Sequence, residues 1–321
     1  MNLILTVSPQ TNPYWNVAVE NYFVSQQAQN QVVMYLWKNH RTVVIGQNQN
    51  PFAECNVDAL LSDGGYVMRR TTGGGAVYHD DGNINFSFVA PHDLYDQLRQ
   101  FEVIRTALRD YGLETELSGR NDILCNGRKF SGNAFSKATH QRLHHGTILI
   151  KGNMDDLSRY LKVRPSKLHK HGVASVQSRV VNLSELADIT SENIVPHLVS
   201  AFEAVYGGKV QTIDFEELKK RPEVVELYNK YSSDEWLYGK WRNFTAQRSG
   251  QFDWGSIDIS LTVDEQRGII TDIAVATDAL EVEIVDKIRN MFIGNSSFKR
   301  PDLPEDSTVK GIANDLLSLI Y

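Results

Sequence analysis

The chain of 321 residues has little cysteine, no long apolar run and no excess of positive charge. Its two cysteines, Cys55 and Cys125, are too few for a disulfide framework. No apolar segment approaches the roughly 20 residues that cross a membrane, and residues 1–7 read as a strand rather than a signal peptide. Lys and Arg number 33 against 39 Asp and Glu, which argues against a general nucleic-acid binder and a polybasic membrane anchor. We therefore expect a cytoplasmic protein with no membrane and no nucleic acid among its partners.

Common nucleotide and zinc signatures are also missing. The glycine-rich segment of the chain is not followed by Gly-Lys-Ser or Gly-Lys-Thr, and Gly-x-Gly-x-x-Gly does not occur. No cluster of Cys and His has the spacing of zinc ligands. A nucleotide that binds to this chain must therefore be held by another geometry.

The most informative segment that is present runs from Arg69 to Phe88 and contains Arg70 followed by three consecutive glycines at 73–75. Glycines without a Cβ let the backbone approach a ligand closely, and arginines supply fork-shaped donors for carboxylate or phosphate oxygens. The residues after the glycines alternate between apolar and polar, as in a strand with one buried face. Taken alone, the segment is either a clamp for a small charged acyl compound or simply a turn.

A second segment, 119–134, predicts a β-hairpin with a lysine in its return strand. Asn126-Gly127 between apolar residues is a strong hairpin signal, because a type I′ turn needs positive φ at two positions. Lys129 is followed by small residues at 131, 132 and 134. This lysine either reaches a ligand or is an ordinary solvated lysine, and the residues alone leave both possibilities open.

A third segment, His144-His145-Gly146-Thr147 and the apolar residues after it, predicts a buried strand. Adjacent residues of a strand point to opposite faces, so only one of the two histidines faces a given site. Structural or hydrogen-bonding roles are therefore favoured over metal binding.

These three segments, in this order, resemble the lipoate–protein ligase family. The resemblance rests on the Arg-Arg-x-x-Gly-Gly-Gly-Ala-Val-aromatic-His-Asp segment at 69–80, on Asn121-Asp122 with the residues at 128–134, and on 144–147. Residues 172–183 resemble the adenylate-binding loop of the family, and 252–255 resemble part of its small C-terminal domain.

The pattern of the sequence predicts an α+β fold, and the resemblance implies a more specific one. It implies a biotin-ligase-like mixed-sheet catalytic domain at 1–245 and a small α+β C-terminal domain at 246–321. Strands are predicted at 2–7, 31–37, 42–46, 65–69, 76–78, 83–89, 147–151, 252–263 and 268–275. Helices are predicted at 14–28, 93–111, 191–206, 214–231, 279–293 and 306–320, with a short one after Asp155 and a polar linker at 241–251.

The activity implied by the resemblance is a two-step ligation that uses ATP and Mg²⁺. Lipoate or octanoate is activated as an adenylate and then passed to a lysine of an acceptor domain. Lys129 is implied to be the noncovalent catalytic residue, and Asp122 to orient the adenylate or hold Mg²⁺ through water. We expect His79 and Asn83 to brace the glycine loop. The implied substrate- and ATP-binding residues are Arg70, Thr72, Gly73, Gly74, Gly75, Ala76, Val77, Tyr78, His79, Asn83, Asn121, Asp122, Lys129, Gly146, Thr147, Ser178 and Arg179.

Alternatives and partners complete these expectations. An ATP-independent octanoyl or lipoyl transferase needs a nucleophile, typically a cysteine, and no cysteine follows Cys125. A noncatalytic lipoate-binding regulator remains the other alternative. The resemblance implies that the acceptors are lipoyl domains of 2-oxoacid dehydrogenase complexes and the glycine-cleavage carrier protein. We expect a monomer, and the sequence does not choose between lipoate and octanoate.

Overall fold

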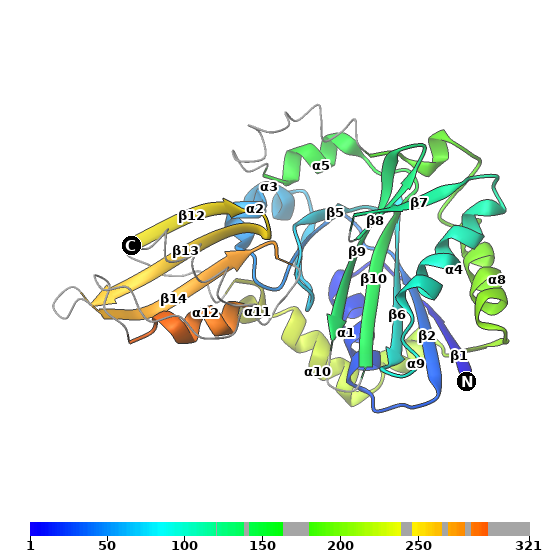
Figure 1. Cartoon of the computed structure of the whole chain (residues 1–321), viewed down its shortest axis with the longest axis horizontal. Coiled ribbons are helices and arrows are strands. Elements are labelled where there is room, and N and C mark those ends of the chain that lie inside the picture. Colours follow the sequence, from blue (N-terminus) through cyan, green and yellow to red (C-terminus); the bar gives the residue numbers. More distant parts are fainter. Residues whose placement is uncertain are drawn as a thin grey trace.

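The computed structural model describes residues 1–119, 121–137, 141–162, 180–238, 246–264, 269–279 and 284–294. These residues form one large mixed sheet, two three-stranded sheets and the helices that pack on them (Figure 1). The α+β class predicted from the sequence is confirmed. Within these ranges, no helix has both the length and the apolar character needed to cross a membrane.

The large sheet has eight strands in the order β11-β1-β2-β6-β10-β9-β8-β7. Strand β1 pairs in parallel with β2 and β11, whereas the remaining neighbours are antiparallel. The strand predicted at 147–151 is the end of a longer one that begins at Gln141. The strands are β1 (Asn2–Val7), β2 (Gln31–Trp37), β6 (Asn83–Pro91), β7 (Thr115–Ser118), β8 (Asp122–Cys125), β9 (Arg128–Lys137), β10 (Gln141–Leu149) and β11 (Val210–Thr212).

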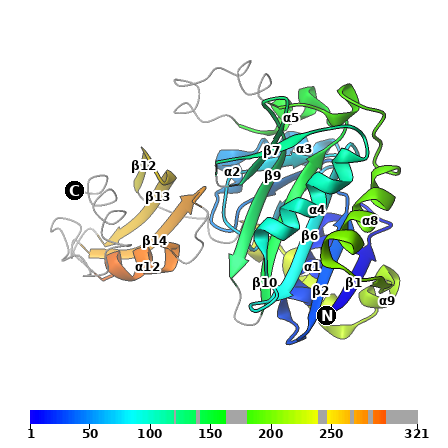
Figure 2. The ribbon, with the colours of Figure 1, turned by 45° about the vertical axis from the view of Figure 1, so that its right-hand side comes forward.

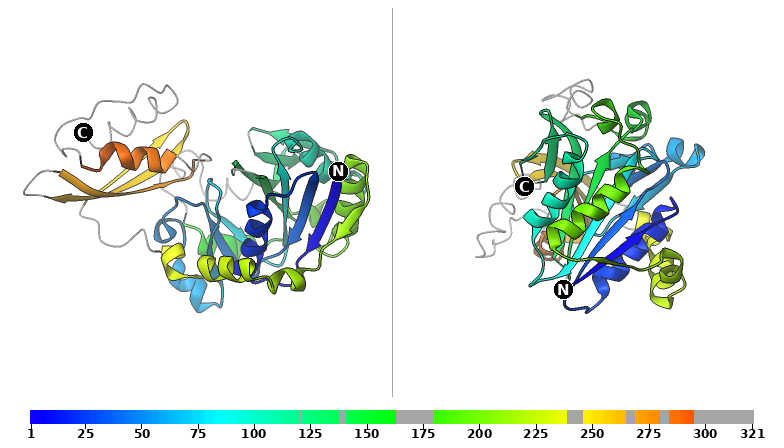
Figure 3. Two further views of the ribbon diagram at one scale, coloured as in Figure 1. Left: turned by 90° about the horizontal axis from the view of Figure 1, so that it is seen from below. Right: turned by 90° about the vertical axis from the view of Figure 1, so that its right-hand side faces the viewer.

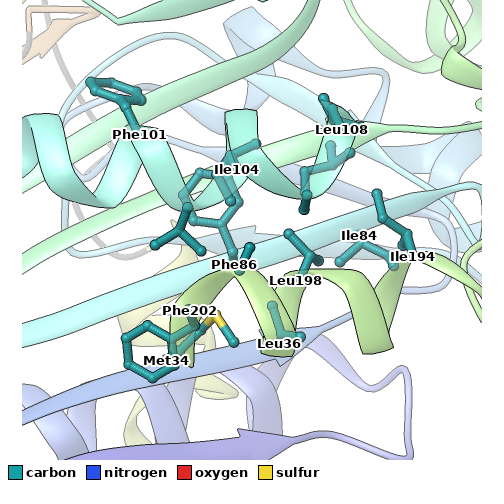
Figure 4. Packing of buried hydrophobic residues seen from close by; sticks show 14 of the residues in the cluster. Met34, Leu36, Ile84, Phe86, Phe101, Ile104, Leu108, Ile194, Leu198 and Phe202 are labelled. Carbon is teal, nitrogen blue, oxygen red and sulfur yellow. The ribbon is translucent and has the colours of Figure 1, made fainter. Parts of the chain in front are cut away.

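One face of this sheet is covered by α4 (Gln97–Arg109) and α8 (Ile194–Tyr206), which lie side by side (Figure 3). Asp96 caps α4 by accepting a hydrogen bond from the Arg99 N–H, as expected of an N-cap carboxylate. Figure 4 shows that both helices present apolar side chains to the strand residues of the core, among them Phe86. The helices predicted at 93–111 and 191–206 are therefore confirmed, with shorter ends.

The opposite face carries α1 (Pro13–Ser25), α9 (Phe215–Lys219) and α10 (Pro222–Tyr231). The single helix predicted over 214–231 is wrong, because a new helix begins at Pro222. Proline lacks the N–H that a continuing helix needs and is favoured at the first turn of a new one.

A three-stranded sheet in the order β4-β3-β5 also lies on this side of the molecule. Its strands are β3 (Thr42–Ile45), β4 (Tyr66–Arg69) and β5 (Val77–His79). Two short helices, α2 (Pro51–Glu54) and α3 (Val57–Ser62), lie between β3 and β4 in the sequence. The remaining short elements of the large body are α5 (Met154–Tyr160), the 3₁₀ turn η1 (Leu183–Glu185) and α11 (Asp234–Tyr238). The glycine loop connects β4 to β5, so this small sheet positions the segment that the sequence singled out.

The hairpin predicted at Asn126-Gly127 is present between β8 and β9. Both residues have positive φ, 51° at Asn126 and 71° at Gly127, as a type I′ turn requires. The hairpin pairs Asp122 with Gly132 and Leu124 with Lys129, and it brings the Asp122 and Lys129 side chains close enough to form an ion pair.

The C-terminal unit contains β12 (Ala246–Phe252), β13 (Gly255–Asp264), β14 (Ile269–Thr277) and α12 (Ile284–Phe292). It projects to one side of the large body, with α12 packed on one face of its sheet (Figure 2). The polar linker predicted at 241–251 is wrong from residue 246 on, because β12 pairs with β13 along its whole length. An exposed edge strand tolerates polar side chains, which hid this strand in the sequence. The helix predicted at 306–320 lies outside the described residues.

Candidate functional site

A cavity of about 230 Å³ is lined by residues of both the large sheet and the small sheet. The small sheet contributes Val44, Met68, Val77 and His79, and the large sheet contributes Trp37, Asn85, His145 and Thr147. Its inner end is deeply buried, whereas Lys129 at the other end is about one-third exposed. The cavity therefore has a largely apolar lining with a few buried polar groups and a cation at its exposed end, which suits an acyl chain that ends in a carboxylate.

Strand alternation explains which residues of the large sheet face the cavity. Thr147 of β10, Asn85 of β6 and Trp37 of β2 are in register and form one row across three strands. Phe86, one position along β6, points to the opposite core. Consistent with the prediction for the two histidines, His144 packs among aromatic rings of that core, while His145 lines the cavity.

The glycine loop is held from beneath by Arg70, which is 7 % exposed. Its guanidinium donates to the carbonyl oxygens of Gly73 and Gly75 at 2.7 and 2.8 Å, and to Thr72 Oγ1 at 3.1 Å. Burial lowers the pKa of Arg70 to about 10, so the group stays charged at neutral pH. The sequence suggested that Arg70 contacts the ligand, and in this structure its donors hold the loop.

Gly46 is a second constraint on the glycine loop that the sequence did not reveal. A Cβ at this position would lie 2.2 Å from the carbonyl oxygen of Gly74. Because that obstacle is backbone, it cannot move aside as a flexible side chain would. The loop can therefore occupy its position only if residue 46 has no side chain.

We expect Gly46→Ala to displace the glycine loop and to weaken binding of the carboxylate ligand. The overpacked methyl should cost about 1–3 kcal/mol in the free energy of unfolding. It should also raise the KM for the acyl substrate roughly tenfold, because about 1.4 kcal/mol corresponds to that factor. Steady-state kinetics and urea unfolding measure the two effects. Gly208→Ala is the control, since its Cβ would meet only the Leu3 side chain at 3.3 Å. An unchanged KM in Gly46→Ala would contradict the claim that Gly46 determines the position of the glycine loop.

A chain of buried polar groups connects the loop to the inner end of the cavity. Trp37 Nε1 donates to Ser87 Oγ, which donates to Glu20 Oε1 at 2.6 Å. His145 Nδ1 lies 2.8 Å from the same carboxylate oxygen and must carry the hydrogen, since a carboxylate only accepts. On its other side, His145 Nε2 lies 2.8 Å from Thr72 Oγ1. The ligand-facing loop and the floor of the cavity are thus one hydrogen-bonded unit.

Lys129 lies at the cavity mouth, where Asp122 Oδ1 is 2.8 Å from its Nζ. Gly132 leaves room for this side chain, because a Cβ there would be 3.0 Å from Nζ. The Lys129 carbonyl accepts a hydrogen bond from the Val181 N–H at 2.9 Å. This bond holds Val181, and with it the described chain that begins at residue 180, directly beside the lysine.

Most of the residues that the sequence nominated line this one cavity, namely Arg70, Gly74, Gly75, Ala76, Val77, His79, Asn121, Lys129, Gly146 and Thr147. Thr72 and Gly73 contact Arg70, and Asp122 contacts Lys129. Tyr78 faces the other side of its strand, where its hydroxyl donates to Asp156. Ser178 and Arg179 lie outside the described residues.

The bracing role expected for His79 and Asn83 is not what their side chains do. His79 Nδ1 lies 3.3 Å from Asn39 Nδ2, and Asn83 donates to Asn85 Oδ1 at 3.1 Å. The first bond joins β5 to the segment between β2 and β3, the second lies within β6, and neither is made to the glycine loop.

Several cavity residues were missed altogether from the sequence, among them Glu20, Trp37, Val44, Met68 and Asn85. They come from α1, β2, β3, β4 and β6, so no single local motif contains them. A signal was available only for Glu20, a charged residue among apolar ones in a predicted helix. Buried charges of this kind are rare unless they are paired.

No group of three or more His, Cys, Asp or Glu side chains that can hold a metal ion occurs in the described part of the chain. Both cysteines are buried. Burial raises the pKa of the Cys55 thiol to about 12 and also raises the pKa of Cys125. Since the thiolate is the reactive form, neither environment activates a cysteine nucleophile.

The buried histidines make folding stability depend on pH. Burial lowers the pKa of His79 to about 3 and that of His144 well below its usual value. The unfolded chain binds these protons near pH 6.5, whereas the folded one does not, so stability is present above pH 6.5 and is lost as the pH falls toward 3. Each histidine should contribute up to about 1.4 kcal/mol per pH unit.

We therefore expect the free energy of unfolding, measured with urea between pH 6.5 and 5, to fall as the pH is lowered. Substituting His144→Gln removes one titrating group and should flatten this slope, whatever it does to absolute stability. The exposed His92 provides the control substitution, His92→Gln, which should leave the slope as it is. An unchanged slope in His144→Gln would show that His144 does not titrate differently in the two states.

Comparison with known families identifies the class of protein that this fold and site define. Residues 12–203 match the model of the lipoyl protein ligase A/B catalytic domain, and residues 242–305 match that of the bacterial lipoate protein ligase C-terminus. The first match alone covers more than half of the chain. The chain belongs to the lipoate–protein ligase family.

Individual relatives agree with this assignment. The chain is 37 % identical to lipoate-protein ligase A of Psychrobacter cryohalolentis over 297 residues, 90 % of this chain and 87 % of the relative. The protein of the same name from Bdellovibrio bacteriovorus is equally similar over the same shares of both chains. Among solved structures, P. falciparum LipL1 in complex with lipoate superposes with a TM-score of 0.81 at 30 % identity, covering 99 % of this chain and 100 % of that one.

Two further structures bear on ligands. A lipoate-protein ligase A bound with ATP has a TM-score of 0.62 and 27 % identity, with 74 % of this chain and 97 % of that chain covered. A bipartite lipoate protein ligase of Thermoplasma acidophilum, studied with its E2 lipoyl domain, has a TM-score of 0.65 and 28 % identity, covering 76 % and 98 %.

Proposed function

We propose that this protein is an ATP-dependent ligase that activates free lipoate, or octanoate, as its adenylate and transfers the acyl group to a lysine of an acceptor domain. The observation that carries the proposal is the position of Lys129 at the mouth of a cavity whose inner wall includes Trp37, Val44 and Met68. A cation at one end and a largely apolar lining match a medium-chain acid. The names and ligands of the relatives support the same reaction.

The chemistry requires the positive charge that the mouth provides. A carboxylate is a poor acyl donor, because oxide would have to leave. In the first step, a carboxylate oxygen attacks the α-phosphorus of ATP, the bond to the pyrophosphate oxygen breaks, and a mixed anhydride forms. In the second step, an acceptor amine attacks the carbonyl carbon, AMP leaves with the bonding pair, and the amine gives up a proton. Lys129 offsets the negative charge that accumulates when two anions meet in the first step.

Other residues take supporting parts in the same proposal. The backbone of Gly73, Gly74, Gly75 and Ala76 wraps the acyl chain, held in place by Arg70 and Thr72. Residues Ser178 and Arg179 bind the adenylate. Asp122 supplies one carboxylate, which fits Mg²⁺ because this ion is usually held by one or two carboxylates together with substrate phosphates and waters. The ion pair with Lys129 keeps that carboxylate at the mouth of the cavity.

The acceptors that we propose are lipoyl domains, by analogy with the Thermoplasma ligase and its E2 lipoyl domain. We extend this to lipoyl domains of 2-oxoacid dehydrogenase complexes and the glycine-cleavage carrier protein. We also propose that residues 1–245 form the catalytic domain and 246–321 an accessory one, that the protein acts as a monomer and that it works in the cytoplasm.

The test is lipoate-dependent exchange of labelled pyrophosphate into ATP. Exchange that requires lipoate, followed by acyl transfer to a purified lipoyl domain, would support the ligase. Absence of exchange in the folded protein, with and without an acceptor domain, would overturn the proposal. Transfer from an acylated carrier protein without ATP would point to the transferase instead.

A further inference from the structure

A fully buried histidine, His144, lies among aromatic rings of the core. The centroids of Phe86, Phe88, Phe101 and Phe135 are 4.7–6.0 Å from its own ring. Phe86 and Phe101 are labelled in Figure 4. An apolar residue would fill this place without the cost of burying a polar ring. The hydrogen bonds of the two ring nitrogens therefore have to offset that cost.

One of these bonds leads to the lining of the cavity through Asn133. His144 Nε2 lies 2.9 Å from Asn133 Oδ1. The side-chain nitrogen of Asn133 donates to the Asn121 carbonyl oxygen at 3.0 Å, so the oxygen of this amide must be the atom that faces His144. Because an amide oxygen only accepts, His144 Nε2 carries the hydrogen.

The other ring nitrogen fixes the direction of this chain of hydrogen bonds. Burial lowers the pKa of His144 well below its usual value, so the ring is neutral and Nδ1 has no hydrogen. Nδ1 lies 3.0 Å from the side-chain amide of Gln100, which must present its nitrogen to this acceptor. The Gln100 oxygen is then turned to the neighbouring Tyr206 hydroxyl, a buried donor that otherwise has no partner among the described residues. The hydrogens thus point one way, from Tyr206 through Gln100 and His144 to Asn133.

Gly146 constrains the same Asn133 side chain from a second direction. A Cβ at position 146 would lie 2.2 Å from Asn133 Oδ1. The oxygen that accepts from His144 therefore occupies the space that a side chain at 146 would fill.

Asn133 connects this buried chain to the mouth of the cavity. The Asn133 N–H and its side-chain nitrogen donate to the Asn121 carbonyl oxygen at 2.8 and 3.0 Å, and Asn121 Nδ2 donates to the Asn133 carbonyl oxygen at 3.0 Å. Asn121 lines the cavity together with Lys129. The next residue, Asp122, forms the ion pair with that lysine at 2.8 Å. The position of Asn121 and Asp122 therefore depends on how the Asn133 side chain is held.

We propose that His144 is a positioning residue for acyl activation and acts through Asn133 on Asn121. Through Asn121 it holds the Asp122–Lys129 pair in place. This inference rests on the proposed acyl-activating function. His144 itself is not part of the cavity lining, whereas Asn133 and Asn121 are. A small displacement of groups that meet developing charge slows a reaction strongly, so the effect falls on the activation step and not on binding of the acyl chain.

The first test compares two substitutions of the histidine. His144→Phe keeps an aromatic ring in the core and removes the donor. We expect kcat for lipoate-dependent pyrophosphate exchange to fall by about 10- to 100-fold, while the KM for lipoate changes by less than about threefold. His144→Gln still offers an amide N–H to Asn133 and should recover most of the lost rate. An equal loss in both variants would overturn the proposal.

Leu198→Ala is the control for loss of stability. Leu198 is fully buried in the same core and has no polar side-chain atom, so its truncation weakens packing alone. At a temperature at which all variants are folded, Leu198→Ala should keep kcat within about twofold of the wild type. An unchanged kcat in His144→Phe, or the same loss of kcat in Leu198→Ala, would overturn the positioning role.

A double-mutant cycle tests whether His144 acts through Asn133. Asn133→Ala removes the intermediate group, so adding His144→Phe to it should change kcat by less than about twofold. Losses that multiply would show independent roles and overturn the proposal.

Crystal structures of the wild type and His144→Phe determine the position of Asn121 independently of activity. We expect Asn121 to be displaced in the variant, and an unmoved Asn121 would overturn the proposal. Absence of exchange in the wild type would instead overturn the proposed function, while the structural comparison would still decide whether His144 positions Asn121.

Discussion

Lys129→Met should abolish adenylate formation and leave the fold intact. The substitution keeps most of the aliphatic stem and removes the charge, so any effect on catalysis comes from electrostatics. Removing one preorganised donor to a developing oxyanion typically costs 10²–10³-fold, and here the donor is also a full charge. We expect lipoate-dependent pyrophosphate exchange to fall by about 10³-fold. Because Lys129 is partly exposed, the free energy of unfolding should change by less than about 1 kcal/mol.

The adjacent residue offers a matched control for this prediction. Arg128 stands in the same strand, carries the same charge and pairs with Glu185 at 3.6 Å on the surface. Arg128→Met should therefore leave the exchange rate within about twofold, as surface charges contribute little. Lys129→Arg should not restore activity, because the planar guanidinium is larger than the ammonium that lies close to Gly132 and presents its donors in a different geometry. Exchange above one-tenth of the wild-type rate in Lys129→Met would contradict the role of the lysine.

The parts of the fold that the sequence predicted correctly are those in which local and tertiary preferences agree. The apolar period of α4 and α8, the Asn126-Gly127 turn and the strands β1 and β2 all appear where the pattern indicated. The failures have physical causes. Pro222 divides a segment whose apolar period continues on both sides, and β12 is an exposed edge strand whose polar side chains carry no strand signal.

The site was only half visible in the sequence for a related reason. The glycine loop and Lys129 belong to short motifs. The loop is recognisable from its consecutive glycines, and Lys129 from the Asn126-Gly127 turn that precedes it. The cavity wall is assembled by sheet registration: Thr147, Asn85 and Trp37 are neighbours only because β10, β6 and β2 pair in one register. Because these residues are far apart in the chain, no periodic pattern in the sequence reveals that they form one wall. Likewise, nothing in the sequence shows that Gly46 must admit the Gly74 carbonyl.

The small C-terminal unit meets the large body through backbone hydrogen bonds, one of them to the glycine loop. The Gly74 N–H donates to the Ala279 carbonyl at 3.0 Å, and the Thr277 N–H donates to the Asn48 carbonyl at 3.1 Å. Loop geometry therefore depends on contacts from outside the cavity as well as on Arg70 within it. The relative weight of these two supports can be measured by removing Arg70 alone.

Arg70→Met should open the glycine loop and cost both stability and substrate affinity. The buried guanidinium satisfies two loop carbonyls and the Thr72 hydroxyl, and hydrogen bonds to charged groups are worth about 1.5–3 kcal/mol each. We expect the free energy of unfolding to fall by about 3 kcal/mol and the KM for lipoate to rise by about 100-fold, measured by urea unfolding and by steady-state exchange kinetics. Arg70→Lys should not rescue, because an ammonium lacks the fork that reaches Gly73 and Gly75 together.

Substituting the neighbouring Arg69 distinguishes the loss of stability from the loss of substrate affinity. It is as buried as Arg70, but its donors go to the carbonyls of Gln47, Gln49 and Leu237 and to none within the glycine loop itself. Arg69→Met should therefore lose a similar amount of stability while the KM for lipoate rises far less. If both variants raise the KM equally, loss of stability explains the effect and Arg70 has no specific hold on the loop. If only Arg70→Met raises it, the loop is positioned by that one buried cation, since the C-terminal contacts at Gly74 remain available in both variants.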